Sequence, residues 1–451
     1  MHAVTGNAAS PPAARGRLLR VFGLVFALAI AIGSTIGGGI LRTPGDIAAL
    51  LPSVPLYLAV WILGGVNALL GATAYAELGT MMPCAGGPYV FARRALGDFA
   101  GFFVGYMNWL QDCTTNAALS LLVAEYTIAF VPALYGHSVP AAFLIYATLV
   151  AVQWRQVRWG GHVQTFTSLA KTIALGGLVV AAFVWPHPAA APGAAHLLPH
   201  GGALLVALAL AMQGVIFTYS GYHYAVFFGE ELHDPGRQIP RSLFYGLALI
   251  IGMYLLLNAA YLWVIPIAHL AHDPFAGATV ARTLFGARGD SIIRAIVIVS
   301  ILGTINVSVL SSARVLLSMG RDRLFLRQAT AVNAGGTPTV ATFLSTLVVF
   351  AFLLSGTFNA ALQVAVAFVV AQYLLMFVTL ILLRRREPEA PRPYRAWGYP
   401  WTTAVGIVIA AAFLAGVALN DTRHTLIALA VLAVSYPLYR LTLRPRRGAR
   451  R

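Results

Sequence analysis

Long apolar stretches follow one another along almost the whole chain, separated by short polar segments. Twelve of them are long enough to cross about 30 Å of hydrocarbon as helices. No stretch alternates apolar and polar residues with the period of two that a membrane β-barrel requires. The pattern therefore predicts an all-α integral membrane protein with 12 transmembrane helices, at approximately residues 21–48, 54–82, 99–131, 139–155, 161–185, 201–232, 240–268, 290–320, 338–356, 359–384, 400–420 and 423–443.

Two of the predicted spans are interrupted in their middle. Gly33-Ser-Thr-Ile-Gly-Gly-Gly39 interrupts the first span, and Thr218-Tyr-Ser-Gly-Tyr222 interrupts the sixth at a comparable depth. Hydrocarbon cannot satisfy the backbone groups that such a break frees, so breaks persist where they line a polar cavity. Gly33 and Gly37 also fit a helix-packing motif, but three consecutive glycines and a second break favour the cavity.

The order of the spans predicts an internal repeat. A broken helix begins each group of five spans, which is the arrangement of two inverted repeats with the substrate site at their interface. The last two spans follow a proline- and arginine-rich segment and form an appendage. The predicted units are an N-terminal cytoplasmic tail (1–20), the first repeat (21–185), the second repeat (201–385), helices 11 and 12 (400–443) and a basic cytoplasmic tail (444–451).

Composition and charge agree with a membrane protein. The 451 residues are 59% hydrophobic and only 10% charged, and the mean hydropathy is +0.78. The formal net charge of +16 does not indicate nucleic-acid binding, because the arginines lie in short loops between spans. If the loops alternate between the two sides, one side collects 23 arginines and the other holds only Arg42, Arg282, Arg288, Arg294 and Arg423. Since basic residues stay cytoplasmic, both termini are predicted to be cytoplasmic, in the cell (inner) membrane.

The sequence shows no signature of an enzyme, a metal site or a cofactor. Cys84 and Cys113 have neither metal-ligand spacing nor a disulfide framework, and no nucleophile–base pair stands out. An ion channel is an alternative from another class, but no repeated filter segment is visible. A secondary transporter remains the leading interpretation, with a polyamine or organic-cation carrier as the nearest alternative, although that substrate would need acidic residues at the site.

The two breaks offer the groups that an amino acid needs. The backbone N–H groups of Gly37, Gly38 and Gly39 lie where a helix restarts, and such N-termini bind carboxylates. Carbonyl groups near Ser34 and Thr35, with those of Phe217 and Ser220 in the second break, would face an ammonium group. A zwitterion needs both sets of groups.

At these residues the chain resembles the amino acid-polyamine-organocation superfamily, closest to its L-type and bacterial amino acid permease branch. The resemblance implies the LeuT-type fold, a 5+5 inverted repeat with broken helices 1 and 6 plus two extra C-terminal helices, and amino acid transport by alternating access. Six motifs carry this resemblance, at residues 33–44, 75–79, 86–89, 217–222, 230–235 and 239–242.

The resemblance also implies a substrate site. It puts the substrate carboxylate on Gly37 to Gly39 and the ammonium near Thr35, Ile36, Phe217 and Ser220. The family often has glycine where Ser220 stands and tryptophan where Tyr222 stands, so the pocket size and the aromatic gate differ here. In animal relatives a cysteine after the third helix links a heavy chain. The segment 131–139 has no cysteine, so no disulfide-linked heavy chain is expected.

Lys171 is the only lysine among the 30 basic residues. It lies about 13–15 Å into the hydrocarbon, where an ionisable residue is functional by default. The alternative is a side chain that extends back to the cytoplasmic surface. In the resembled family a fifth-helix lysine replaces a sodium ion against the first helix, so the resemblance implies that Lys171 is that surrogate cation and a possible carrier of a coupling proton.

Two further polar residues lie within spans. Asp112, in the third span, sets the substrate's charge preference or pairs with a buried cation, or else it is a structural residue bonded to a neighbouring helix. His223 follows the second break, where it lines the side-chain pocket or packs between helices.

A charge cluster marks the cytoplasmic end of the sixth span. Glu230 and Glu231 precede Arg237 and Arg241, and ion pairs among them would form a cytoplasmic gate. The alternative is a set of solvated surface charges.

Overall fold

The computed structural model describes residues 18–186, 198–271, 273–355, 358–420 and 422–443. Within these residues the chain forms helices, turns and loops, with isolated bridges but no β-strand. The predicted all-α class is therefore confirmed. Residues 1–17, 187–197 and 444–451 lie outside the described residues, and so do the predictions for most of the two tails.

Each predicted span contains a helix whose bounds follow the apolar pattern closely. The helices are α1 (Leu24–Thr35), α2 (Gly39–Leu50), α3 (Val54–Met81), α4 (Pro88–Leu96), α5 (Asp98–Ile128), α6 (Ser138–Arg155), α7 (Val157–Val184), α8 (Gly202–Thr218), α9 (Pro235–Val264), α10 (Ile267–Leu270), α11 (Ala276–Phe285), α12 (Ala287–Arg321), α13 (Thr339–Ser355), α14 (Phe358–Arg386), α15 (Trp401–Asn420) and α16 (Thr422–Leu443), with 3-10 turns η1 (Pro132–Leu134), η2 (Tyr222–Phe227) and η3 (Arg327–Thr330).

Both predicted helix breaks are present. Helix α1 ends at Thr35 and α2 begins at Gly39, with a bend of 41° between them. Helix α8 ends at Thr218 and continues after a turn as η2. Helix α1 packs against η2, and α2 packs against α8. The first half of one broken helix therefore lies beside the second half of the other, so the two run antiparallel.

Fewer helices than expected are apolar enough to span a membrane on their own. Among the described residues five helices qualify by length and composition, α3, α7, α9, α12 and the unit of α8 with η2, and the bent pair α1 and α2 makes a sixth. Helix α5 has 31 residues but carries polar side chains such as Asp112 and Asn116. Polar residues that face neighbouring helices lower the mean hydropathy of a span, so the chain is shown to be a multi-pass membrane protein without a confirmed span number.

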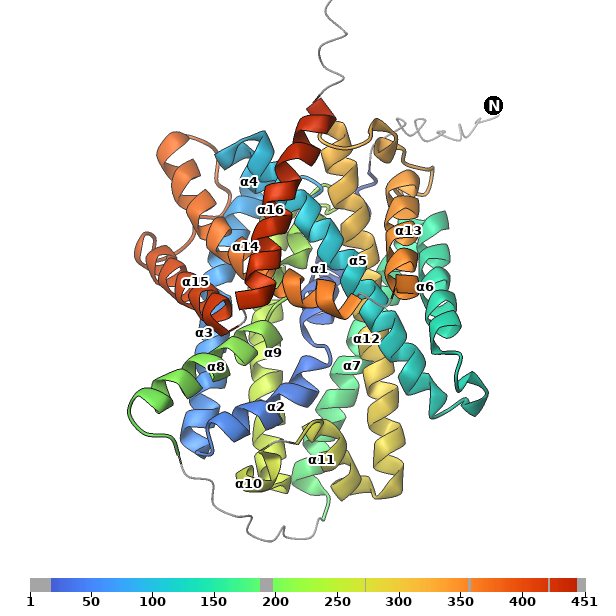
Figure 1. Cartoon of the computed structure of the whole chain (residues 1–451), viewed down its shortest axis with the longest axis vertical. Coiled ribbons are helices and arrows are strands. Elements are labelled where there is room, and N and C mark those ends of the chain that lie inside the picture. Colours follow the sequence, from blue (N-terminus) through green and yellow to red (C-terminus); the bar gives the residue numbers. More distant parts are fainter. Residues whose placement is uncertain (1–17, 187–197, 272, 356–357, 421, 444–451) are drawn as a thin grey trace, which may run out of the picture.

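The helices form one bundle with short helices at its two ends (Figure 1). The long helix α12 packs against α5 and α7, and α9 packs against α1 and α3. Helix α4 lies at one end of the bundle, while α10 and α11 lie at the other. The broken helices α1 and α2 run through the middle, with α3, α5, α7, α9 and α12 around them.

The end of the bundle that holds α4 is tied together by ion pairs. Glu77, at the end of α3, is buried and accepts hydrogen bonds from Arg384 at 2.9 Å, from Arg392 at 3.1 Å and from the backbone N–H of Ala396 at 2.7 Å. Glu77 therefore has the architectural role that its position suggests, because it fixes the segment between α14 and α15. Beside it, hydrogen bonds from Arg94 lower the pKa of the Glu387 carboxyl below its ordinary value.

Candidate functional site

A cavity of about 220 Å³ lies between the two helix breaks. Because α1, α2, α8 and η2 all end or begin there, its wall includes backbone groups that no helix satisfies. Helices α5 and α12 complete the wall. The lining residues are Ser34, Thr35, Gly37, Gly38, Gly39, Gln111, Thr115, Leu119, Phe217, Thr218, Ser220, Gly221, His223, Tyr224, Ile301, Thr304, Val307 and Ser308.

The three glycines of the first break expose the start of α2 to this cavity. A Cβ atom at Gly38 would meet no atom within 4 Å, and one at Gly37 would meet its nearest atoms only at 4.0 Å. Since helix geometry leaves the first N–H groups of α2 without intrahelical partners, these groups and the positive end of the helix dipole are accessible to an anion in the cavity.

The second break touches the first at Gly221. This residue has a φ angle of 111°, which residues other than glycine rarely adopt. A Cβ atom there would lie 2.6 Å from the carbonyl oxygen of Ser34. The Ser34 hydroxyl oxygen, which donates to the Ile30 carbonyl at 2.6 Å, also lies 2.8 Å from the Gly221 carbonyl oxygen. Glycine at this position therefore allows the two interrupted helices to meet.

Lys171 lies at the first break, as the sequence analysis expects. Its side chain is fully buried in α7, and Nζ donates to the carbonyl oxygens of Gly33 and Ile36, each at 2.6 Å. The Ser300 hydroxyl of α12 donates to the same Ile36 oxygen at 3.0 Å. The ammonium therefore joins α1, α7 and α12 at the break and does not extend to the surface.

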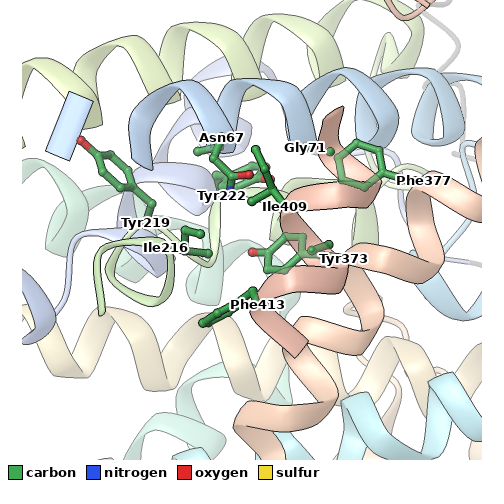
Figure 2. Close-up of a pocket in the computed structure, with 12 residues that line it drawn as sticks. Asn67, Gly71, Ile216, Tyr219, Tyr222, Tyr373, Phe377, Ile409 and Phe413 are labelled. Atoms are coloured by element: carbon green, nitrogen blue, oxygen red, sulfur yellow. The ribbon is translucent and has the colours of Figure 1, made fainter. Parts of the chain in front are cut away.

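Two of the predicted substrate contacts face away from the main cavity. The Ile36 side chain is completely buried, so Ile36 contributes only backbone at the break. Tyr222 points into a second cavity of about 30 Å³, where Asn67, Gly71 and Tyr373 also lie (Figure 2). Tyr222 therefore stands behind the wall of the main cavity, and the structure does not support it as a direct substrate contact.

His223 combines the two roles that the sequence left open. It lines the main cavity, and its ring stacks on Tyr75 with ring centroids 4.9 Å apart and on Tyr224 at 5.2 Å. Its Nδ1 atom lies 3.4 Å from the Tyr373 hydroxyl. These contacts hold the imidazole within a group of aromatic rings.

Asp112 lies behind the cavity wall rather than in it. Its carboxyl accepts hydrogen bonds from Tyr224 at 2.7 Å, from Ser308 at 3.2 Å and from Ser311 at 2.6 Å. Tyr224 and Ser308 line the cavity, so Asp112 is connected to the wall through their hydroxyl groups.

The predicted charge cluster forms ion pairs, but with other arginines. Glu231 is fully buried and pairs with buried Arg314 of α12, with a second contact at 2.7 Å. Glu230 pairs with Arg321 at 2.6 Å. Arg237 lies 3.8 Å from Asp234, and Arg241 is exposed, so neither forms the expected contact with the two glutamates.

Several residues of the site were not predicted from the sequence. Gln111 and Thr115 of α5, and Thr304 and Ser308 of α12, line the cavity. Each pair is spaced by four residues, which puts its members on one helix face, and this spacing is the signal that could have found them. Arg314 carried a second signal, because it is a single charge within the apolar end of the predicted span 290–320.

Among the described residues no group of three or more histidine, cysteine or acidic side chains is placed to hold a metal ion. The geometry is that of a small polar cavity enclosed by interrupted helices in a membrane protein. Such a cavity is suited to a small ligand with both an anionic and a cationic group, because α2 offers N–H donors and α1 and α8 offer carbonyl groups.

Comparison with known proteins agrees with this geometry. The family model described as "Amino acid permease" matches residues 22–436. The serine/threonine exchanger SteT of Bacillus subtilis is 26% identical over 434 residues, which is 94% of this chain and 96% of the relative. The human large neutral amino acids transporter small subunit 2 is 28% identical, over 86% of this chain and 75% of its own length. The mouse b(0,+)-type amino acid transporter 1 is 23% identical, over 88% of this chain and 82% of its own.

Because the family model covers nearly the whole chain, including both helix breaks and all the lining helices, the protein belongs to the amino acid permease family and is an amino acid transporter, not an enzyme.

Proposed function

We propose that this permease moves amino acids by alternating access around the cavity between α1, α2, α8 and η2. The single observation that carries this proposal is that both interrupted helices border one cavity. The substrate carboxylate binds the N–H groups at Gly37 to Gly39, and its ammonium group binds carbonyl oxygens of Thr35, Phe217 and Ser220.

The proposal includes the LeuT-type arrangement of two inverted repeats, residues 21–185 and 201–385, within twelve spans. The antiparallel contact of the two broken helices supports it, since repeats related by a two-fold axis in the membrane plane produce such contacts. The excess of arginine in alternate loops supports a location in the cell membrane with both termini in the cytoplasm.

Two modes of coupling fit the site. Lys171 can release and regain a proton, so we propose it as the residue that links transport to a proton gradient. Obligatory exchange is the second mode, and one relative is named as a serine/threonine exchanger. Glu231 with Arg314, and Glu230 with Arg321, are proposed as the contacts that close one end of the cavity.

A polyamine carrier of the same fold is less favoured by the site. A polyamine has no carboxylate to occupy the N–H groups at Gly37 to Gly39, and it needs acidic groups that face the cavity. The acidic residue nearest the wall, Asp112, is already occupied by three hydroxyl groups.

The test is counterflow in liposomes that contain the purified protein. Vesicles loaded with an unlabelled amino acid should accumulate the labelled one transiently, which a carrier shows and a channel does not. Absence of uptake and exchange for all the natural amino acids would refute the proposal, and uptake of polyamines alone would favour the alternative.

Two leucine substitutions make this test specific for the site. Gly38→Leu adds a side chain whose Cβ atom would meet no atom within 4 Å, in a backbone conformation that other residues adopt, so the fold should survive while the carboxylate is displaced. A Cβ atom at Gly252, in α9, also meets no atom within 4 Å, so Gly252→Leu is the matched control. We expect a loss of transport of at least about tenfold in the first variant only, a change of about 1.4 kcal/mol in binding free energy.

A further inference from the structure

Most hydroxyl groups around the cavity share one property, which is that they donate their hydrogen bond to an acceptor within the protein. Ser34 donates to the carbonyl of Ile30 at 2.6 Å, and Thr35 donates to that of Ala31 at 2.8 Å. In the second broken helix Thr218 donates to Gly214 at 2.8 Å and Ser220 to Phe217 at 2.7 Å, and in α12 Thr304 donates to Ser300 at 3.2 Å.

Tyr224 and Ser308 in the cavity wall follow the same rule, but their acceptor is a carboxyl group. Tyr224 of η2 and Ser308 of α12 both donate to Oδ1 of Asp112, at 2.7 Å and 3.2 Å. Ser311, which does not line the cavity, donates to Oδ2 at 2.6 Å. The two donors that line the cavity therefore meet one carboxyl oxygen, and the other oxygen is held from behind.

A hydroxyl group has one proton and two lone pairs. Because the Tyr224 and Ser308 hydroxyl groups donate their hydrogen bonds to Asp112, their oxygens can only accept hydrogen bonds from a ligand in the cavity. The carboxylate behind them adds negative potential at close range in a buried site. This wall consequently accepts hydrogen bonds and repels anions.

The donors of the site lie elsewhere. The N–H groups where α2 begins, at Gly37 to Gly39, bind the substrate carboxylate in the proposed function, and the side chains of Gln111 and Thr115 on α5 are further donors. A bound amino acid therefore has its carboxylate at the donor end, and its side chain meets a wall that accepts hydrogen bonds.

We propose that Asp112, acting through Tyr224 and Ser308, makes the permease select amino acids whose side chains donate a hydrogen bond, such as a hydroxyl or a carboxamide group, over aliphatic and acidic side chains of the same shape. This proposal rests on the proposed function, because it assumes that an amino acid occupies the cavity. Asp112 is a positioning residue in this scheme, since it directs the two hydroxyl groups and does not touch the substrate.

The experiment compares pairs of amino acids of nearly equal shape in the same proteoliposomes. Threonine and valine differ by a hydroxyl in place of a methyl group, and asparagine and aspartate differ by an amide in place of a carboxylate. The measured quantity is the ratio of kcat/KM within each pair. We expect at least about a tenfold preference for threonine over valine, and a larger preference for asparagine over aspartate, because a lost hydrogen bond and a repelled charge act in the same direction.

Three variants identify the wall as the cause. Tyr224→Phe removes one acceptor oxygen, and Asp112→Asn removes the negative charge while keeping the shape of the side chain, so both should bring the threonine-to-valine ratio close to one. Asp112→Asn should also raise the relative uptake of aspartate. Cys113→Ala, next to Asp112 but directed at the Ser345 carbonyl of α13, controls for damage to α5 and should keep the wild-type ratios.

The possible results separate this inference from the function beneath it. Uptake with valine equal to or better than threonine, or ratios that persist in both Tyr224→Phe and Asp112→Asn, would overturn the inference and leave amino acid transport intact. Absence of uptake for every amino acid would overturn both. Because ratios within one protein are compared, a variant with a lower yield of folded protein still gives a result.

Discussion

Lys171 occupies the place of hydrogen bonds that the first helix break removes. In an intact helix the Gly33 carbonyl would accept from the N–H of residue 37, and the Ile36 carbonyl from that of residue 40. The break removes both donors, and Nζ of Lys171 contacts both oxygens at 2.6 Å. One ammonium group therefore stabilises the interrupted backbone, and its protonation is linked to the geometry of the break.

Replacing Lys171 by methionine should separate its structural and coupling roles. Methionine has a similar length but no donor, so both buried carbonyl groups lose the ammonium. The Ile36 oxygen keeps the Ser300 hydroxyl, and a buried polar group left unsatisfied costs about 1–3 kcal/mol. We expect a lower melting temperature in detergent, transport reduced at least about tenfold, and residual transport that no longer depends on pH or on an imposed proton gradient.

The pH profile is the part of this experiment that a purely structural role would not change. Ser300→Ala, which removes another donor to the Ile36 carbonyl but no charge, is the control and should keep the wild-type dependence on pH. Residual transport in Lys171→Met with the wild-type pH and gradient dependence would rule out Lys171 as the coupling residue.

At the scale of residues, local signals were predictable and long-range partners were not. Gly37 to Gly39 and Lys171 could be identified because their composition is unusual for a membrane helix. The contacts of Tyr222 could not, because the sequence does not show which side chains of η2 face the main cavity, as His223 does, and which face the second one. The glutamate pairs were assigned to Arg237 and Arg241 by proximity in sequence, whereas folding brings α12 to them.

Helix α1 and the 3-10 turn η2 are joined to α12 through Glu231. Its backbone carbonyl accepts from the N–H groups of Val21 and Phe22, at 3.0 Å and 3.1 Å, just before α1. Its side chain pairs with Arg314, whose guanidinium also lies over the Phe228 ring, 4.4 Å from the centroid. A single residue therefore connects the start of α1, the end of η2 and α12.

Glu231→Gln and Glu230→Gln form a matched pair that tests this connection. Glu231 is fully buried against Arg314, so neutralising it leaves a buried charge without a partner, at about 3–5 kcal/mol. Glu230 and Arg321 have 23% and 32% of their side-chain surfaces exposed, so the same change there should alter stability by less than about 1 kcal/mol. Thermal unfolding in the same detergent measures the change in stability of both variants. Equal changes would show that the buried pair stabilises the protein no more than the exposed pair does.

Element boundaries followed from the sequence where they depend on chain composition alone. The breaks after Thr35 and Thr218 lie within the predicted segments, and α3 ends one residue from the predicted limit. The sequence did not indicate the short helices α4, α10 and α11, because these are amphipathic or only a few residues long and gain their stability by packing on the bundle ends.

On the scale of the whole molecule, the two broken helices divide the site between two groups of elements. Helix α1 packs on η2 near one end of the bundle, and α2 packs on α8 toward the other. The contacts of Glu231 and Glu230 with α12 lie on the α1 side of the cavity. Alternating access requires these contacts to separate when the cavity opens at that end, so weakening them should shift the protein toward the state that is open there.

Cysteine labelling measures this shift directly. In a protein with Cys84 and Cys113 replaced by serine, Ser220→Cys places a thiol in the cavity wall. A membrane-impermeant maleimide, added to membranes of either orientation, should reach this thiol from both faces over time, and substrate should slow the reaction. Adding Glu231→Gln should speed labelling from the face on the α1 side and slow it from the opposite face, because one population grows only as the other falls. Adding Glu230→Gln instead should change both rates much less. If the Ser220→Cys protein, alone and with either glutamine substitution, is labelled from one face only, the site does not open alternately to the two sides.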